Sequence, residues 1–142
     1  MEAALCGVVL RYLMIFGLLV ASTASAQGVA VRATCAAKVA AEHSRTLRAE
    51  IERALADATA AEGYSLDVTL EKLDVIARGG ELEVRASVRA LVADPHGAMR
   101  WTSSAHAVAK GRTRERAQLV HDAVAEAGRA VAASVRTRLP TR

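Results

Sequence analysis

The run Lys110-Gly111-Arg112-Thr113-Arg114-Glu115-Arg116 concentrates cations in a short stretch of the chain. The apolar spacing that follows it predicts a helix, so the run lies at a helix start, where free backbone N–H groups already carry partial positive charge. Cations are unfavourable there unless an anion binds, and helix starts are natural sites for phosphate or carboxylate. The candidate anion-binding site, for a lipid headgroup, a phosphorylated glycan or an acidic partner, consists of Lys110, Arg112, Thr113 and Arg114. The alternative is a solvated run in which Glu115 offsets part of the charge.

A second candidate site is the polar face of the predicted strands. Arg85 and Arg89 alternate with apolar residues, so both point to the same side of one strand. A flat face that carries Arg85, Arg89 and His106 is suited to a protein partner. The alternative is an ordinary solvated face, on which a pair between Asp74 and Arg85 contributes at most about 1 kcal/mol.

The remaining reactive side chains match no catalytic or metal-binding pattern. Ser103 and Ser104 lie in an alternating strand and not in a G-x-S-x-G turn. The histidines lack the H-x-x-x-H and H-E-x-x-H spacings, and no glycine-rich phosphate loop occurs. We therefore expect no catalytic residue, no metal and no cofactor. The net charge of +4 is a mild excess among many acidic residues, so we expect no nucleic-acid partner.

The first residues of the chain have the order of a secretory signal peptide. Arg11 precedes the apolar run 12–21, and residues 22–26 are small and end in an A-x-A pattern. The apolar run is shorter than the roughly 20 residues that a membrane-spanning helix needs. We predict a cleaved signal peptide over residues 1–26 with cleavage after Ala26. Residues 27–142 then form a single domain that is periplasmic or secreted.

Cys35 is the only cysteine of this predicted mature chain. Arg32 stands three residues before it, where a lipoprotein signal has an apolar residue, so no lipid anchor is predicted. A single thiol cannot form a disulfide within its own domain. It is either a half-buried thiol near the first helix or the site of an intermolecular disulfide.

Hydrophobic periodicity predicts two helices and three long strands. Apolar residues recur every three or four positions over 35–61, and again from Thr113, the expected N-cap, to Leu139. Between these helices, apolar and polar residues alternate over 66–76, 82–92 and 99–109, and Val29 and Val31 indicate a short first strand. Only one face of the strands is apolar. The predicted fold class is therefore α+β: a two-layer sandwich of order (β)αβββα, an antiparallel sheet with both helices on one face.

The first hairpin has a predicted register. A two-residue turn at Gly79-Gly80 pairs Val75 with Val84. Further from the turn, the apolar phase slips by one residue, which predicts a β-bulge at Glu71-Lys72.

The second hairpin turns at Asp94-Pro95-His96-Gly97. A loop of these residues pairs Ala90 with Trp101, which keeps core residues together. It also places His106 beside Arg85 on the polar face.

The same turn and the strand after it, Asp94 to Trp101, resemble a feature of small periplasmic envelope-assembly domains. These are the curli-secretion lipoprotein, the lipoprotein activators of penicillin-binding proteins and the amino-terminal domain of the Tol–Pal translocation protein. In that group an Ala- and Leu-rich helix leads into the strands, and a D-x-x-G turn precedes a strand that carries a tryptophan. The resemblance covers about 29–139 and implies a non-enzymatic scaffold or adaptor with no catalytic residue. The chain departs from the group in having no lipobox cysteine and only a short first strand.

These observations predict a non-catalytic interaction or scaffold module of the bacterial cell envelope, with an envelope protein as partner. The alternatives are a small lipid or small-molecule carrier and a secreted enzyme. A sizeable pocket beneath Trp101 would favour the carrier, and an enzyme would need a convergent polar pocket.

Overall fold

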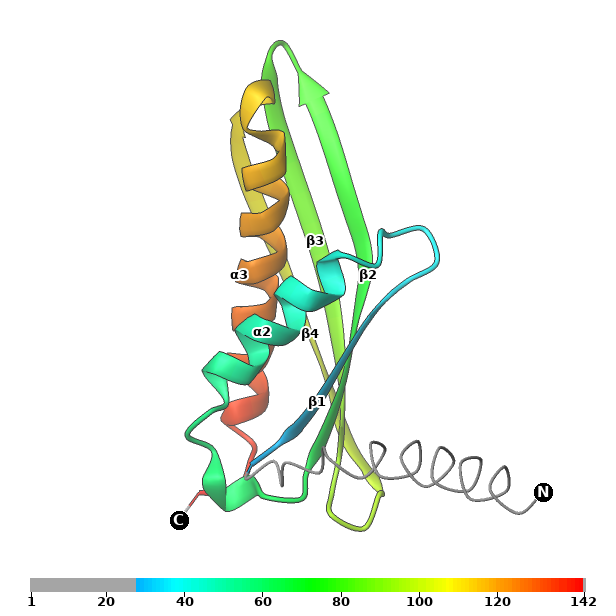
Figure 1. Ribbon diagram of the computed structural model, residues 1–142, viewed down its shortest axis with the longest axis vertical. Coiled ribbons are helices and arrows are strands. Elements are labelled where there is room, and N and C mark those ends of the chain that lie inside the picture. The colour runs from blue at the N-terminus through cyan, green and yellow to red at the C-terminus, as the bar shows by residue number, and fades with distance from the viewer. Residues whose placement is uncertain (1–27, 142) are drawn as a thin grey trace, which may run out of the picture.

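The computed structural model describes residues 28–141, so the predicted signal peptide and its cleavage site lie outside the described residues. Two layers are present, a four-stranded sheet and two helices on one of its faces (Figure 1). The elements follow in the order β1 (Ala30–Cys35), α2 (His43–Ala54), the 3₁₀ turn η1 (Thr59–Ala61), β2 (Ser65–Arg78), β3 (Glu81–Ala93), β4 (Met99–Arg112), the 3₁₀ turn η2 (Thr113–Glu115) and α3 (Arg116–Arg136). The predicted α+β two-layer architecture is confirmed.

The sheet is mixed, and this differs from the fully antiparallel sheet expected from the sequence. Its strand order is β1-β2-β3-β4, and the three long strands form antiparallel pairs. β1 is longer than its sequence signal and lies parallel to β2. Parallel neighbours need a long crossover connection, and the segment that contains α2 provides it.

The first helix is much shorter than the 35–61 predicted from periodicity. Cys35 belongs to β1, where it pairs with Leu70, and α2 begins only at His43. The residues between them form turns, and the residues after Ala54 form a turn and η1. The apolar spacing continues across these turns because some of their side chains also face the core. The periodicity therefore predicts a longer helix than the structure contains.

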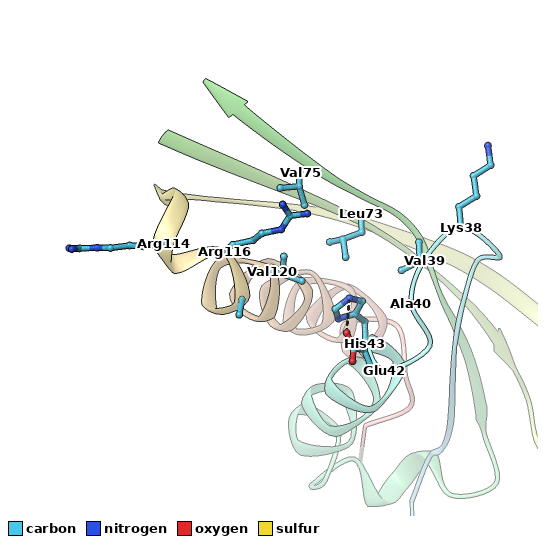
Figure 2. A pocket seen from close by; sticks show the side chains of 11 residues that line it. Lys38, Val39, Ala40, Glu42, His43, Leu73, Val75, Arg114, Arg116 and Val120 are labelled. Carbon is cyan, nitrogen blue, oxygen red and sulfur yellow. Dashed lines mark ion pairs between the residues drawn. The ribbon is translucent and has the colours of Figure 1, made fainter. Parts of the chain in front are cut away.

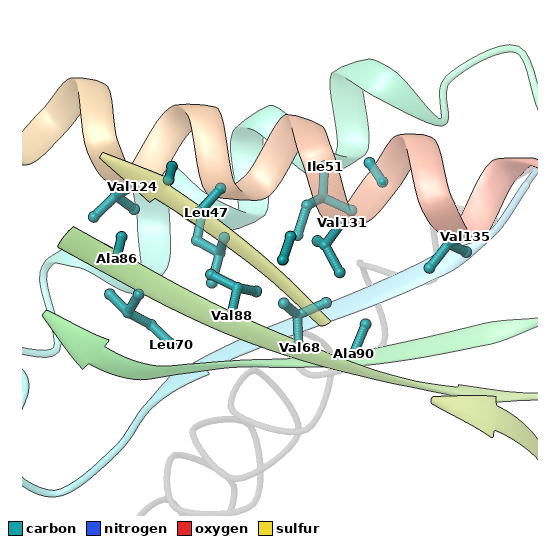
Figure 3. Close-up of a cluster of buried hydrophobic side chains, with 14 of the residues drawn as sticks. Leu47, Ile51, Val68, Leu70, Ala86, Val88, Ala90, Val124, Val131 and Val135 are labelled. Atoms are coloured by element: carbon teal, nitrogen blue, oxygen red, sulfur yellow. The ribbon is translucent and has the colours of Figure 1, made fainter. Parts of the chain in front are cut away.

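The core lies between the sheet and the two helices, where side chains from both layers point toward one another (Figure 3). Val88 is 1% exposed, as the predicted inward phase of its strand requires. Small side chains along α3 allow close approach to the sheet and to α2. The fully buried larger side chains are Leu47, Ile51, Leu66, Val68, Leu70, Val84, Val88, Val92, Val124, Val131 and Val135. No helix among residues 28–141 has the length and apolarity to cross a membrane.

The first hairpin is confirmed in detail. Val75 pairs with Val84 across the Gly79-Gly80 turn, and both turn glycines have positive φ. The register shifts between Leu70 and Lys72, so Glu71 is the extra residue of the predicted bulge.

The register predicted for the second hairpin is wrong by two residues. Ala90 pairs with Ser103, and Trp101 pairs with Val92. The loop is one residue longer than predicted, since Ala93 pairs with Met99, and Arg100 is an extra residue in β4. An even shift leaves every side chain on its predicted face, which is why the core pattern is still correct.

The buried side chain of Asp94 stabilises this loop through hydrogen bonds. Its side chain is 4% exposed, and Oδ1 accepts hydrogen bonds from the backbone N–H groups of His96 (2.9 Å) and Ala98 (3.0 Å). Oδ2 accepts a hydrogen bond from Arg100 Nε at 2.7 Å. Burial by itself raises the pKa of Asp94, but the two backbone bonds and Arg100 outweigh it and hold this pKa below its ordinary value.

Substituting Asp94→Asn is expected to make the protein less sensitive to acid. Because the folded state holds the Asp94 pKa below its unfolded value, the carboxylate stabilises the fold above the unfolded pKa. That contribution is lost as pH falls from the unfolded pKa through the lower folded pKa. Urea unfolding as a function of pH checks this: the gap in stability between wild type and D94N should close on acidification. The matched control is Asp74→Asn, which removes an exposed carboxylate. If the stability difference between wild type and D74N closed on acidification as much as that for D94N, the role given to the buried Asp94 carboxylate would be wrong.

Candidate functional site

The outer face of the sheet carries the three predicted partner-binding residues, but not in the predicted arrangement. Arg85 lies opposite Val108 and not beside His106, because of the register shift in the second hairpin. His106 lies opposite Ser87, and its Nδ1 is 2.8 Å from Ser87 Oγ.

Both predicted partner-binding arginines of this face, and Lys110 beside them, lie next to acidic side chains. Arg85 forms an ion pair with Glu83, and Lys110 Nζ lies 3.4 Å from the same carboxylate. Hydrogen bonding to Arg85 is the main reason why the pKa of Glu83 is lowered, with a further contribution from Lys110. Arg89 Nε lies 3.0 Å from Glu71, the bulge residue. Arg85, Arg89 and Lys110 therefore each have an acidic neighbour on this face.

The predicted anion site is divided by the structure. Lys110 and Arg112 alternate within β4 on the outer face, whereas Arg114 follows in η2. Thr113 is not the N-cap of a long helix, because α3 begins at Arg116. The Thr113 hydroxyl instead donates to the carbonyl of Gly80 at 3.1 Å. The four residues are thus divided between the end of β4 and η2, and binding of an anion by them stays a prediction.

A groove opens on the inner side of the sheet, where α2, α3 and the far half of β2 meet (Figure 2). Its volume is about 680 Å³, within the roughly 300–1,000 Å³ of small-molecule sites, although it is open to solvent. Trp101 is not among its lining residues, so the groove is not the pocket beneath Trp101 that would favour a carrier. The lining residues are Lys38, Val39, Ala40, Glu42, His43, Leu73, Val75, Arg114, Arg116, Ala117 and Val120.

The groove combines apolar side chains with charged ones, of which Lys38, Arg114 and Arg116 are basic and Glu42 is acidic. Leu73 and Val75 approach Val120 across it, and Arg116 extends toward Val75 (Figure 2). Lys38 stands at the other end, on the loop before α2. Among the described residues, no acidic side chain forms an ion pair with Lys38, Arg114 or Arg116. Such a surface is complementary to a ligand that is both apolar and acidic.

Two features of the sequence pointed toward this groove without identifying it. Leu73 and Val75 are inward positions of β2 that stay half-buried, because β1 ends opposite Leu70 and α2 covers only the near half of the strand. Arg116 belongs to the predicted basic run, but Lys38 was assigned to a helix that does not exist there. Lys38 and Arg116 are far apart in the sequence, and only the folded chain places both in the lining of one groove.

The groove holds few groups that do chemistry on a substrate. Glu42 Oε1 and His43 Nε2 are 3.9 Å apart, and they are sequence neighbours at the start of α2. Within residues 28–141 no three His, Cys, Asp or Glu side chains gather as metal ligands. Cys35 is half-buried at the end of β1, and burial raises the pKa of its thiol, which keeps it a weak nucleophile. The arrangement is suited to binding.

Comparison of the sequence with known protein families and with well-described proteins finds no match. Solved structures do match. The minor lipoprotein of Acinetobacter baumannii has a TM-score of 0.56 at 15% identity, over 80% of this chain and 96% of that chain. The hypothetical protein CT253 of Chlamydia trachomatis has a TM-score of 0.53 at 13% identity, over 80% and 95%. Rare lipoprotein B of Shewanella oneidensis has a TM-score of 0.50 at 16% identity, over 75% and 93%.

The likeness is one of fold. The chain shares this architecture with bacterial lipoproteins, which agrees with the general character of the resemblance found in the sequence. The finer resemblance, to curli-secretion, penicillin-binding-protein activator and Tol–Pal domains, stays a prediction.

Proposed function

We propose that the protein is an exported, non-catalytic interaction module of the bacterial cell envelope, and that the groove between β2, α2 and α3 is its docking site. The observation that carries this proposal is a groove in which apolar side chains lie beside Lys38, Arg114 and Arg116, three cations that form no ion pair among the described residues. The signal-peptide pattern and the fold shared with bacterial lipoproteins support the location.

The shape of the groove favours an interaction module over the other two candidates. A carrier shields most of its ligand from water, whereas this groove is open along its length. An enzyme needs a nucleophile, base and orienting group in mutual reach. The lining offers one adjacent Glu–His pair and no hydroxyl or thiol. The outer face, with Arg85, Arg89 and His106, is a weaker candidate because its arginines already pair with acids.

Substituting Ala117→Glu is expected to weaken ligand binding in the groove. Ala117 is exposed on α3 and lines the groove, so a carboxylate there occupies the apolar surface and neutralises the nearby arginines. An anionic naphthalene sulfonate dye is the probe, and titration followed by fluorescence should show an affinity about tenfold weaker than in wild type. The matched control is Ala133→Glu, at an exposed position near the other end of the same helix. Equal loss in both variants, or in neither, would exclude the groove as the site.

Export is tested separately by fractionating cells that produce the full chain or a chain that starts at Gly28. We expect the full chain in the periplasm or medium and the shortened chain in the cytoplasm. Retention of both in the cytoplasm would contradict an envelope role.

A further inference from the structure

β2 has an open edge beside the groove. β1 pairs with β2 only from Ser65 to Leu70, and the last bond of the pair runs from the Ala36 N–H to the Leu70 carbonyl at 3.0 Å. β2 then continues to Arg78 with β3 on one side and no described strand on the other (Figure 1). Edges of this kind are templates for an added strand unless charge or structure blocks them.

The hairpin register identifies which backbone groups this edge presents. The two-residue turn is closed by the pair Arg78–Glu81, which exchanges hydrogen bonds in a tight hairpin. Hydrogen-bonding direction alternates along an antiparallel strand. Leu73, Val75 and Ala77 therefore direct their N–H and C=O groups away from β3, toward the open edge.

The same residues connect the edge to the groove. Leu73 and Val75 face inward, so their side chains line the groove while their backbone groups face the vacant strand position. A strand added at that position places alternate side chains on the inner face, where the groove can receive them.

The charges around the edge define the partner. Lys72 and Arg78 are exposed on the outer side of the edge, and Lys38 and Arg116 stand at the groove. Asp74 is the one acidic side chain between Lys72 and Arg78 in the sequence. No ion pair within the described residues involves any of these cations. Glu42 also lines the groove, so Lys38, Lys72, Arg78 and Arg116 outnumber two acidic side chains, and the remaining positive charge is complementary to an acidic segment.

We propose that an extended segment of a partner protein, alternating apolar and acidic residues, adds to the edge of β2 along residues 73–77. This inference rests on the proposed function and specifies how its partner docks. The segment's backbone bonds to Leu73, Val75 and Ala77, its apolar side chains enter the groove, and its carboxylates meet the surrounding cations.

The test uses the chain from Gly28 and a synthetic peptide that alternates valine and glutamate. We expect amide hydrogen exchange at Leu73, Val75 and Ala77 to slow when this peptide binds. A peptide of the same length that alternates valine and lysine should bind at least about tenfold more weakly. Absence of added protection at these three amides, or equal binding of the two peptides, would overturn strand addition.

Two variants of Val75 separate the contribution of its backbone N–H to peptide binding from the contribution of its side chain. Val75→Pro removes an outward N–H at an edge position, where proline is tolerated, and should weaken peptide binding at least about tenfold. Val75→Thr keeps the N–H and the branched shape while changing the side chain in the groove, so it should bind more tightly than V75P. Equal affinities of the two variants would contradict a role for this N–H. Circular dichroism verifies that both variants fold. If V75P does not fold, the hydrogen-exchange experiment on the unmodified chain decides whether the peptide adds as a strand.

The outcomes distinguish this inference from the proposed docking site. If Ala117→Glu weakens dye binding but the acidic peptide gives no edge protection, the groove stands and strand addition fails. If vesicles of phosphatidylglycerol bind wild type and V75P equally while the peptide does not bind, the occupant is an anionic lipid and strand addition is wrong. If Ala117→Glu changes neither dye nor peptide binding, the groove itself is not the site.

Discussion

Replacing Leu47 with alanine is expected to lower the free energy of unfolding by about 2–5 kcal/mol. Leu47 is fully buried where α2 crosses α3 above the sheet (Figure 3). Truncation removes its apolar contacts and leaves a cavity that the close-packed helices fill only in part. A domain of this size has a total stability of about 5–15 kcal/mol, so the loss is a large fraction of it.

Urea unfolding measures this prediction, with Leu91→Ala as the matched control. Leu91 is the same residue type at 40% exposure, on the outer face of β3. Truncation there should change stability by less than about 0.5 kcal/mol. Similar losses in both variants would mean that the helices do not cover the sheet as described.

The substitution Gly128→Val is expected to destabilise the protein by about 1–3 kcal/mol through overpacking. Gly128 is buried on α3 against α2, and a Cβ added there would lie 3.1 Å from Leu47 Cδ1 and 3.5 Å from Glu50 Cβ. Valine adds two further methyl groups in this contact, and its branched side chain is also less favourable in a helix. Thermal unfolding should show a clear decrease in Tm.

Two further variants test whether overpacking against Leu47 causes the destabilisation by Gly128→Val. Gly128→Ala should be nearly neutral, since one tight contact is offset by a helix-propensity gain of about 1 kcal/mol. In a Leu47→Ala background, Gly128→Val should cost less than in wild type, because the missing leucine leaves space for the new methyl groups. Additive losses in the double variant would show that Gly128 does not meet Leu47.

Local alternation carried most of the information about the three long strands. The inward phase of β3 and the bulge at Glu71 both follow from the two-residue period, because a slip in that period changes which face a side chain occupies. The tight turn at Gly79-Gly80 fixed the first register, since it allows one pairing of the residues that flank it.

The register of the hairpin between β3 and β4 could not be predicted from the local sequence pattern. The turn after Asp94 was recognised, but its length depends on hydrogen bonds that the buried carboxylate makes to His96, Ala98 and Arg100. Alternation could not detect the error, because a shift of two residues preserves both faces. The predicted contact between Arg85 and His106 failed for this reason alone.

The sequence by itself determined the class of fold, the inward residues of the strands and the single apolar face of the sheet, because these follow from periods of a few residues. Tertiary structure decided that β1 lies parallel to β2, that the first helix begins at His43 and that Thr113 binds Gly80 instead of capping a helix. It also created the groove, which joins Lys38, Val75 and Arg116. These features depend on where β1 ends against β2 and on how much of the sheet two helices can cover, and such contacts between distant segments leave no periodic signal in the chain.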